Sequence, residues 1–198
     1  MAKFDPLSGL PKALLSKLQI LIGSDDGEED YDTTWYPDGY GSDQISMGHD
    51  GTGSCDGGFR FLRSVIPNNM KIVKAVLRVK CALNSTKRPV WVIKGIKEPS
   101  PDTFAAGGAD RPSTRAKTTA TVAWSPGADW ALNTWYESPD IKAIIDELIA
   151  QAEFDNKAIG LVIEDNSSPS NNYDNVWDSN HAAADAARLV LTLAPKIN

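Results

Sequence analysis

Hydrophobic and polar residues alternate along several stretches of this chain. Between Ile72 and Leu83 the apolar side chains keep one phase and the basic side chains keep the other. The apolar phase consists of Ala75, Leu77, Val79, Cys81 and Leu83. The basic phase consists of Lys74, Arg78 and Lys80. Because successive side chains of a strand point to opposite faces of its sheet, this pattern predicts a strand with one buried and one exposed face.

Other stretches also predict strands. Residues 118–124 place Ala120, Val122 and Trp124 inward, with threonines on the solvent side, as half-exposed sheets favour. Residues 158–163 form an unbroken apolar run, which is typical of a strand buried on both faces. The remaining predicted strands are residues 18–22, 59–67 and 89–96, and the last is residues 188–193.

One segment changes to a helical period. Its apolar residues form a single stripe at spacings of three and four, namely Ile141, Ile144, Ile145, Leu148 and Ile149. Ser138 is predicted as the N-cap, Pro139 as the first helical residue, and Asp140 as an acidic group suited to the positive end of the helix dipole. The pattern predicts an amphipathic helix over residues 139–152 that packs on the sheet.

Two segments lack a strand pattern. Residues 11–18 can form a short helix with Leu14, Leu15 and Leu18 on one side, so residues 1–17 are predicted to be a helical leader that docks the protein or builds an oligomer. Packing of this leader against its own domain is the alternative. Residues 23–58 are rich in Asp, Gly, Tyr and Ser, which predicts a long loop that is functional or ordered by a metal.

Short strands, many turns and one helix predict a mainly β domain over residues 18–198, an antiparallel β-sandwich or jelly roll. The chain has 198 residues, of which 41% are hydrophobic, enough for a real core. Its net charge of −6 and its pI near 4.9 exclude the basic surface that nucleic-acid binding needs.

The N-terminal region shows no targeting or spanning segment. The apolar stretch 13–22 is interrupted by Lys17 and is too short to cross a bilayer. The first residues lack the apolar core and the cleavage site of a signal peptide. We therefore expect a protein that is made in a cytoplasm and is not inserted into a membrane.

Two cysteines, Cys55 and Cys81, are too few for a disulfide-rich scaffold. Cys81 falls in the inward phase of its strand and is expected to be a small buried hydrophobic residue. A bridge between the two stays open as an alternative that requires an oxidising environment.

Six carboxylates fall within the eight residues 25–32. Ca²⁺ takes six to eight oxygen ligands, so this cluster predicts a calcium site. The predicted ligands are Asp25, Asp26, Glu28 and Glu29. Glu164 and Asp165 follow a predicted strand and are candidates for completing the site, and the alternative is an acidic loop that is only solvated.

Two groups of aromatic residues are candidates for ligand binding. Sugar-binding sites stack rings on pyranose faces beside Asp and Asn side chains, and residues 171–177 have that mixture. The predicted ligand-binding residues are Trp35, Tyr36, Tyr40, Tyr173 and Trp177. Alternatively, these rings close the ends of the sandwich or an intersubunit contact, whereas Trp124, Trp130 and Trp135 are expected in the core or its loops.

No catalytic constellation is visible in the sequence. His49 and His181 lie in polar stretches without metal-ligand spacing and are expected at the surface. Ser and Asp residues are numerous but show no nucleophile–base–orienter arrangement. We predict that the protein is not an enzyme, and a pair of glycan-cleaving carboxylates is the alternative.

The order of several short motifs resembles a family of bacterial extracellular β-sandwich modules, similar to jelly-roll carbohydrate-binding modules. The motifs are residues 57–61, 65–67, 72–75, 114–124, 138–140 and 158–163, within a resemblance that covers residues 18–195. It implies a sandwich whose first strand is followed by an acidic stretch, here residues 24–29. Members of the family usually follow a signal peptide and sit beside other domains, and we expect this chain to differ from them in both respects.

A bacteriophage particle reconciles an exterior type of sandwich with a chain that lacks an export signal. We expect a non-enzymatic virion surface protein, either a capsid decoration protein or a tail or fibre component. Residues 1–17 are expected to contact other virion proteins, and the domain is expected to form a homo-oligomer or to touch a host surface glycan. The alternative is a secreted carbohydrate-binding module that recognises a polysaccharide.

Overall fold

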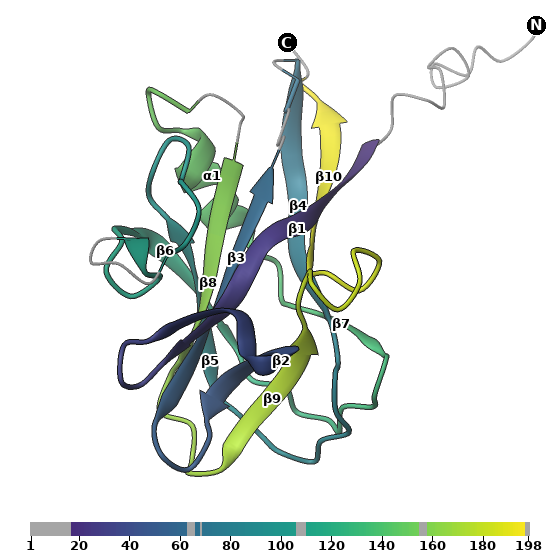
Figure 1. Ribbon diagram of the computed structural model, residues 1–198. Coiled ribbons are helices and arrows are strands. Elements are labelled where there is room, and N and C mark those ends of the chain that lie inside the picture. The colour runs from purple at the N-terminus through teal and green to yellow at the C-terminus, as the bar shows by residue number, and fades with distance from the viewer. Residues whose placement is uncertain (1–16, 63–65, 68, 106–109, 155–157, 197–198) are drawn as a thin grey trace, which may run out of the picture.

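The computed structural model describes residues 17–62, 66–67, 69–105, 110–154 and 158–196, without the side chains of residues 17–24, 38 and 40–42. Ten strands and one helix run through this described part (Figure 1). In chain order they are β1 (Lys17–Asp30), β2 (Trp35–His49), β3 (Ser54–Leu62), β4 (Met70–Lys80), β5 (Trp91–Ile96), β6 (Lys117–Trp124), β7 (Trp135–Glu137), α1 (Lys142–Ile149), β8 (Ala158–Asp165), β9 (Asn172–Trp177) and β10 (Arg188–Pro195).

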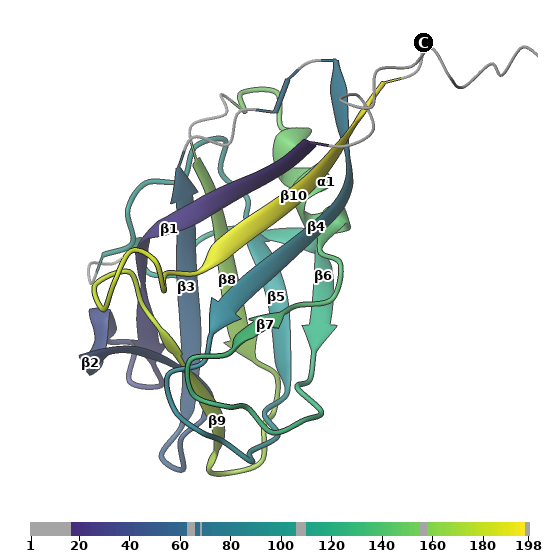
Figure 2. The same cartoon turned by 90° about the vertical axis from the view of Figure 1, so that its right-hand side faces the viewer.

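The strands form two antiparallel sheets that lie one behind the other (Figure 2). In the first sheet, the start of β1 pairs with β10, β10 pairs with β4, and β7 follows at the edge. In the second sheet, β6, β5, β8 and β3 pair in that order, and the end of β1 joins β3. β1 thus belongs to both sheets, and its register shifts between Gly23 and Asp25. The predicted antiparallel β-sandwich is confirmed.

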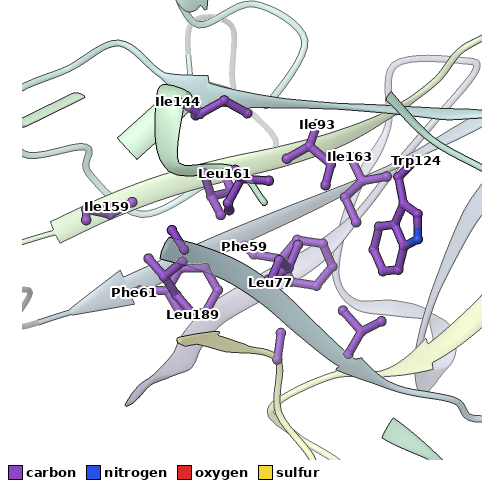
Figure 3. Close-up of a cluster of buried hydrophobic side chains, with 14 of the residues drawn as sticks. Phe59, Phe61, Leu77, Ile93, Trp124, Ile144, Ile159, Leu161, Ile163 and Leu189 are labelled. Carbon is purple, nitrogen blue, oxygen red and sulfur yellow. The ribbon is translucent and has the colours of Figure 1, made fainter. Parts of the chain in front are cut away.

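Large apolar side chains fill the space between the sheets (Figure 3). Phe59 and Phe61 of β3 are fully buried there. At one end of the core, Trp91 meets Trp124 and Trp130 edge-on, with ring centres 5.1 and 5.6 Å apart. Edge-on aromatic pairs are favourable beyond the area that they bury, so the tryptophans consolidate this end of the sandwich.

The predicted alternations agree with the burial of β4 and β6. The inward phase of β4 is buried, and so is Cys81 directly after it. In β6, Trp124 is buried, and Ala120 and Val122 pack against the core. Leu83 is the exception, because β4 has already ended and the side chain is 50% exposed.

Helix α1 closes one open side of the sandwich. The buried members of its predicted stripe are Ile141, Ile144, Ile145 and Leu148, with Ile149 partly buried. On the same helix, the Glu147 carboxylate accepts hydrogen bonds from the N–H groups of Thr119 and Ala120, at 3.0 and 2.8 Å. These donors belong to β6, an edge strand, so the helix satisfies groups that an open edge would leave unpaired.

The helix is shorter than predicted, and Ser138 is not its N-cap. Ile141 takes the cap position and makes no side-chain cap hydrogen bond. The Ser138 hydroxyl oxygen instead accepts the N–H of Leu77 at 3.0 Å. Asp140 similarly accepts the N–H of Ala75, also at 3.0 Å. The polar residues before the helix therefore satisfy β4, a tertiary demand that the local sequence does not reveal.

A second, smaller apolar cluster lies on the outer face of the second sheet, consisting of Trp35, Ile96, Phe104 and Val162. The connection between β5 and β6 packs there against β3, where a Cβ on Gly58 would lie 2.9 Å from a Pro112 ring carbon. Arg115 fixes this connection, because its guanidinium donates to the carbonyls of Asp102 and Thr103, both at 2.7 Å. The hydrophobic pattern of the chain does not predict this outer layer.

The predicted long loop over residues 23–58 is wrong. β1 continues to Asp30, and β2 and β3 occupy most of the remainder. The strand pattern is hidden because buried positions of β1 carry Asp26 and Glu28 in place of apolar residues. Asp26 accepts hydrogen bonds from the N–H and hydroxyl of Ser179, and Glu28 accepts one from the Ser46 N–H. These partners allow the carboxylates to be buried.

Both cysteines are free and buried, so the bridge that the sequence left open is not formed. Cys81 is a core residue, as predicted, and its thiol donates to the Leu83 carbonyl oxygen at 2.8 Å. Cys55 lies on β3, and its environment is described with the candidate site.

The predicted helical leader, residues 1–17, lies outside the described residues except for Lys17, which begins β1. Its docking or oligomerising role stays a prediction. In the described part of the chain, no helix combines the length and the apolar character needed to cross a membrane.

The stability of the fold is expected to fall as the pH rises from about 4 to about 7. Burial, reinforced by the nearby carboxylates of Glu164, Glu29 and Asp165, raises the pKa of Asp56 to about 7. An unfolded Asp has a pKa of about 4, so in this window the folded state binds more protons than the unfolded state. The raised pKa therefore lowers the free energy of unfolding increasingly as the pH rises through this window. Above about pH 7 the decrease has reached its full size.

The size of this effect for Asp56 is about 4 kcal/mol, at about 1.4 kcal/mol for each pKa unit. Asp56→Asn keeps an acceptor for the Asp165 N–H, which lies 2.7 Å from the Asp56 carboxylate. We expect the variant to flatten the pH dependence of the free energy of unfolding measured in urea. Glu153→Gln, which changes an exposed carboxyl, is the control and should leave the profile as it is. An identical slope in wild type and Asp56→Asn would contradict the assignment.

Candidate functional site

A polar hollow of about 580 Å³ lies where β1, β2, β3 and β9 meet. Two tyrosines, Tyr31 and Tyr173, contribute aromatic rings to its wall. The amides of Gln44 and Asn175 line it as well. β2 and β9 pair directly, with Gln44 opposite Trp177, so segments far apart in the sequence build one wall. Rings beside amides are the combination that recognises sugar hydroxyls and pyranose faces.

Tyr31 is held at the mouth of the hollow by the turn between β1 and β2. The turn is closed by a hydrogen bond from the Thr33 N–H to the Asp30 carbonyl oxygen, at 2.8 Å, and Thr33 has a φ of +68°. The Tyr31 side chain packs against Gly53, where an added Cβ would lie 2.3 Å from it. Tyr31 is nevertheless 51% exposed, so its ring is supported from behind and open to solvent.

Tyr173 lies on β9 opposite Gly48 of β2. A side chain at Gly48 is excluded by its φ of +119° and by the Asn172 carbonyl oxygen, which would lie 2.4 Å from an added Cβ. The Nζ of Lys87 lies 3.2 Å from the centre of the Tyr173 ring, a cation–π contact. The Tyr173 ring is therefore fixed in place and already bears an ammonium group on one face.

Three carboxylates also line the hollow. Glu28 is 3% exposed and accepts the Ser46 N–H at 2.7 Å, and burial raises its pKa. Asp30 accepts the N–H of Tyr31 at 2.8 Å. Asp50, in the turn between β2 and β3, accepts the N–H groups of Thr52 and Gly53. Backbone donors thus orient all three groups.

Glu28, Asp30 and Cys55 bring their ligand atoms within 4.8 Å of one another, the one such group among the described residues. The Cys55 thiol donates toward Asp30 at 3.7 Å. Burial raises the pKa of this thiol, and the neighbouring carboxylates raise it further. The raised pKa opposes formation of the thiolate that a metal ligand must supply.

The structure does not bring the four predicted calcium ligands together. Asp26 and Glu28 point to the same face of β1 as Phe59 of β3, whereas Asp25 and Glu29 point to the opposite face. On that outer face, the Asp25 carboxylate lies 3.8 Å from Arg60. The four groups therefore form two separate sets, and the calcium site remains a prediction without a shared ligand sphere.

The partners of Asp26 and Glu29 show how each set is stabilised. Glu29 accepts hydrogen bonds from the N–H and hydroxyl of Ser113 and forms an ion pair with Arg111 at 3.3 Å. Burial raises the pKa of Asp26 to about 6, against the lowering effect of its hydrogen bonds from Ser179. Both carboxylates bind other segments of the chain, so they act as structural groups.

The predicted aromatic residues are also separated. Trp35 is 4% exposed, packs on Phe104 with ring centres 5.2 Å apart, and does not line the hollow. Tyr36 is half-buried on β2, and the side chain of Tyr40 lies outside the described residues. Trp177 stacks on His181 at 3.7 Å outside the hollow. Of the four predicted residues whose side chains are described, Tyr173 is the one that lines it.

Four other residues named in the sequence analysis also have partners or positions that the structure describes. Glu164 is engaged by Lys94, and Asp165 lies beside Asp56, so neither approaches the carboxylates of the hollow. His181 is exposed, whereas His49 is half-buried and accepts the Gly51 N–H at 3.1 Å.

Tyr31 and the polar side chains of β2 escaped the sequence analysis. The alternation of Gln44 and Ser46 with the buried Ile45 and Met47 is the signal that could have found them. This alternation does not by itself predict a strand, because the surrounding Gly and Asp residues are typical of loops. Tyr31 has no comparable signal, since its position depends on the turn.

Comparison with protein-family models finds none that matches this chain, and comparison with curated proteins finds no significant relative. Of the resemblance to extracellular modules, the structure bears out the β-sandwich. Because one fold hosts many functions, the function has to be argued from the side chains of the hollow.

Proposed function

We propose that this protein is a non-enzymatic binding module that recognises a saccharide in the hollow between β1, β2, β3 and β9. The observation that carries the proposal is the joint presence of Tyr31 and Tyr173 with two amides and three carboxylates around one space. A pyranose ring offers apolar C–H faces to the tyrosines and hydroxyls to the polar groups. The volume of about 580 Å³ suits a small number of sugar units.

We propose that the hollow does not catalyse a reaction, and the support is that its carboxylates already have structural partners. Asp30 and Asp50 accept backbone N–H groups of their own turns. Glu28 holds the Ser46 N–H of the neighbouring strand. Groups fixed in this way are suited to positioning hydroxyls. The test is incubation with every saccharide that binds, with no new reducing ends expected over a day.

Alanine substitution of the two tyrosines tests the binding proposal. Tyr31→Ala and Tyr173→Ala should each weaken binding of the best saccharide from an immobilised glycan panel at least about tenfold, as loss of a central aromatic contact does. Affinity is measured by calorimetry, and circular dichroism checks that each variant is folded. Unchanged affinity in both folded variants would contradict the proposal.

Trp177→Ala is the matched control, since it removes an aromatic ring from the same strand as Tyr173. Trp177 donates its indole N–H to Asn133 and stacks on His181, and it does not line the hollow. The variant should bind as wild type does. Loss of binding in Trp177→Ala alone would instead favour the wider aromatic surface predicted from the sequence.

The place of display is a separate proposal: a bacteriophage particle, as a decoration, tail or fibre component. Its support is the order of sequence motifs shared with exterior β-sandwich modules, together with the leucine-rich residues 1–17. Removal of residues 1–16 should abolish co-sedimentation with particles and leave the melting temperature of the domain unchanged, because β1 begins at Lys17. Retained co-sedimentation would contradict this role of the leader.

A further inference from the structure

The hollow has a one-sided charge. Glu28, Asp30 and Asp50 line it, and no Lys or Arg is among its described lining residues. Charges near a protein surface interact with an energy of a few kcal/mol at close range, so three carboxylates repel an anionic ligand and attract a cationic one. Uronic acids and phosphorylated sugars are therefore poor candidates for this space.

Lys87, whose ammonium group contacts a wall ring of the hollow, does not cancel this charge. Its ammonium lies over the Tyr173 ring, outside the set of lining residues. It also lies close to Asp174, which is 1% exposed. Burial raises the pKa of Asp174, and the charges of Lys87 and Arg88 oppose that rise. Three carboxylates line the hollow against the ammonium group of Lys87 beside it, so the hollow keeps its negative sign.

The Lys87–Tyr173 contact is itself evidence of ligand type. It shows that a wall ring of the hollow accepts an ammonium group at 3.2 Å from its centre. Tyr31, in the turn between β1 and β2, presents a ring to solvent and is 51% exposed. A ligand that carries both a pyranose face and an ammonium group would use the ring of Tyr31 and the carboxylates beside it.

We infer that the hollow prefers saccharides with a free, charged amino group, such as glucosamine units, over neutral N-acetylated or acidic sugars. This inference rests on the saccharide-binding function proposed above and names its ligand class. The ammonium group would be paired with Glu28 and Asp30, whose oxygens converge near Cys55. Charge-assisted hydrogen bonds of this kind are about twice as strong as neutral ones. N-acetylation removes the positive charge of the amino group and therefore its pairing with Glu28 and Asp30.

Calorimetry with three probes of equal length tests the inference: a glucosamine tetrasaccharide, its fully N-acetylated form, and a galacturonic acid tetrasaccharide. A pH of about 6 keeps the carboxylates of the galacturonic acid probe ionised, since the usual pKa of a carboxyl group is about 4. We expect the glucosamine probe to bind at least about tenfold more tightly than the N-acetylated probe, and the acidic probe not to bind. In Glu28→Gln and Asp30→Asn this preference should fall to within about twofold.

The two substitutions preserve the acceptors for the Ser46 and Tyr31 N–H groups, so both variants are expected to fold. Asp146→Asn, which removes a surface carboxylate of α1 paired with Lys142, is the control and should keep the full preference. Equal affinity for the first two probes, or tighter binding of the acidic probe, would overturn the inference alone. Absence of binding by all three probes would instead defeat the saccharide-binding proposal, and the inference with it.

Discussion

Ile145→Asp is expected to abolish cooperative folding of the domain. Ile145 is fully buried on α1, in the main core between the sheets. An aspartate there removes an apolar side chain and leaves an unpaired carboxyl in the core, a combination that costs more than about 5 kcal/mol. Domains of this size have a total stability of about 5–15 kcal/mol, so the variant should lose most or all of it. The measurement is the unfolding transition followed by circular dichroism in urea.

Ala143→Asp is the matched control for this substitution. Ala143 lies on the same helix but is exposed, so its aspartate remains solvated. Substitutions at such surface sites usually change stability by less than about 0.5 kcal/mol. If Ile145→Asp and Ala143→Asp melted at the same temperature, α1 could not pack in the core as described.

Arg115→Ala is expected to release the outer layer without unfolding the sandwich. The Arg115 guanidinium donates to two carbonyl oxygens and lies 4.9 Å from the centre of the Phe104 ring. Hydrogen bonds to a charged group contribute about 1.5–3 kcal/mol each, so the loss of both should destabilise the β5–β6 connection by about 3 kcal/mol or more. Amide hydrogen exchange should increase over residues 97–105, and Trp35 fluorescence should shift to the red as water reaches Phe104 and Trp35.

Arg88→Ala provides the comparison. Its guanidinium also donates to backbone carbonyls, those of Thr86 and Lys87, and pairs with Asp129. This arginine is exposed, however, and exposed pairs contribute about 0–1 kcal/mol. Its exchange pattern should match the wild type over residues 97–105. Unaltered exchange in Arg115→Ala as well would show that this arginine does not fix the outer layer.

The strands that the sequence predicted correctly carry apolar residues at their inward positions. β4, β6 and β8 are examples, because their burial follows hydrophobic periodicity directly. β1 differs, since buried Asp26 and Glu28 are satisfied by Ser179 and Ser46, which lie in other segments. A strand whose buried positions are acidic looks like a loop until its hydrogen-bond partners are known.

The candidate site could be predicted only in part for the same reason. Tyr173 was found because its aromatic and amide neighbours are contiguous in the sequence. Tyr31 could not be predicted from the sequence. It lines the hollow because the turn between Asp30 and Thr33 positions it and because its side chain packs against Gly53. Trp35 stands in a polar segment that was predicted to be a loop, yet Phe104 covers it. Phe104 belongs to the connection between β5 and β6, which has no periodic hydrophobic pattern.

The most direct test of the central claim is an NMR titration of the tyrosine ring resonances with the glucosamine and N-acetylglucosamine tetrasaccharides. Binding in the hollow should shift the ring signals of Tyr31 and Tyr173 saturably. The ring of Tyr136 stacks on Trp130, with ring centres 4.2 Å apart, and it does not line the hollow. The ring signals of Tyr136 should therefore not shift. Unshifted Tyr31 and Tyr173 signals at saturating saccharide, or saturable shifts confined to Tyr136, would contradict the proposal that this hollow is the binding site.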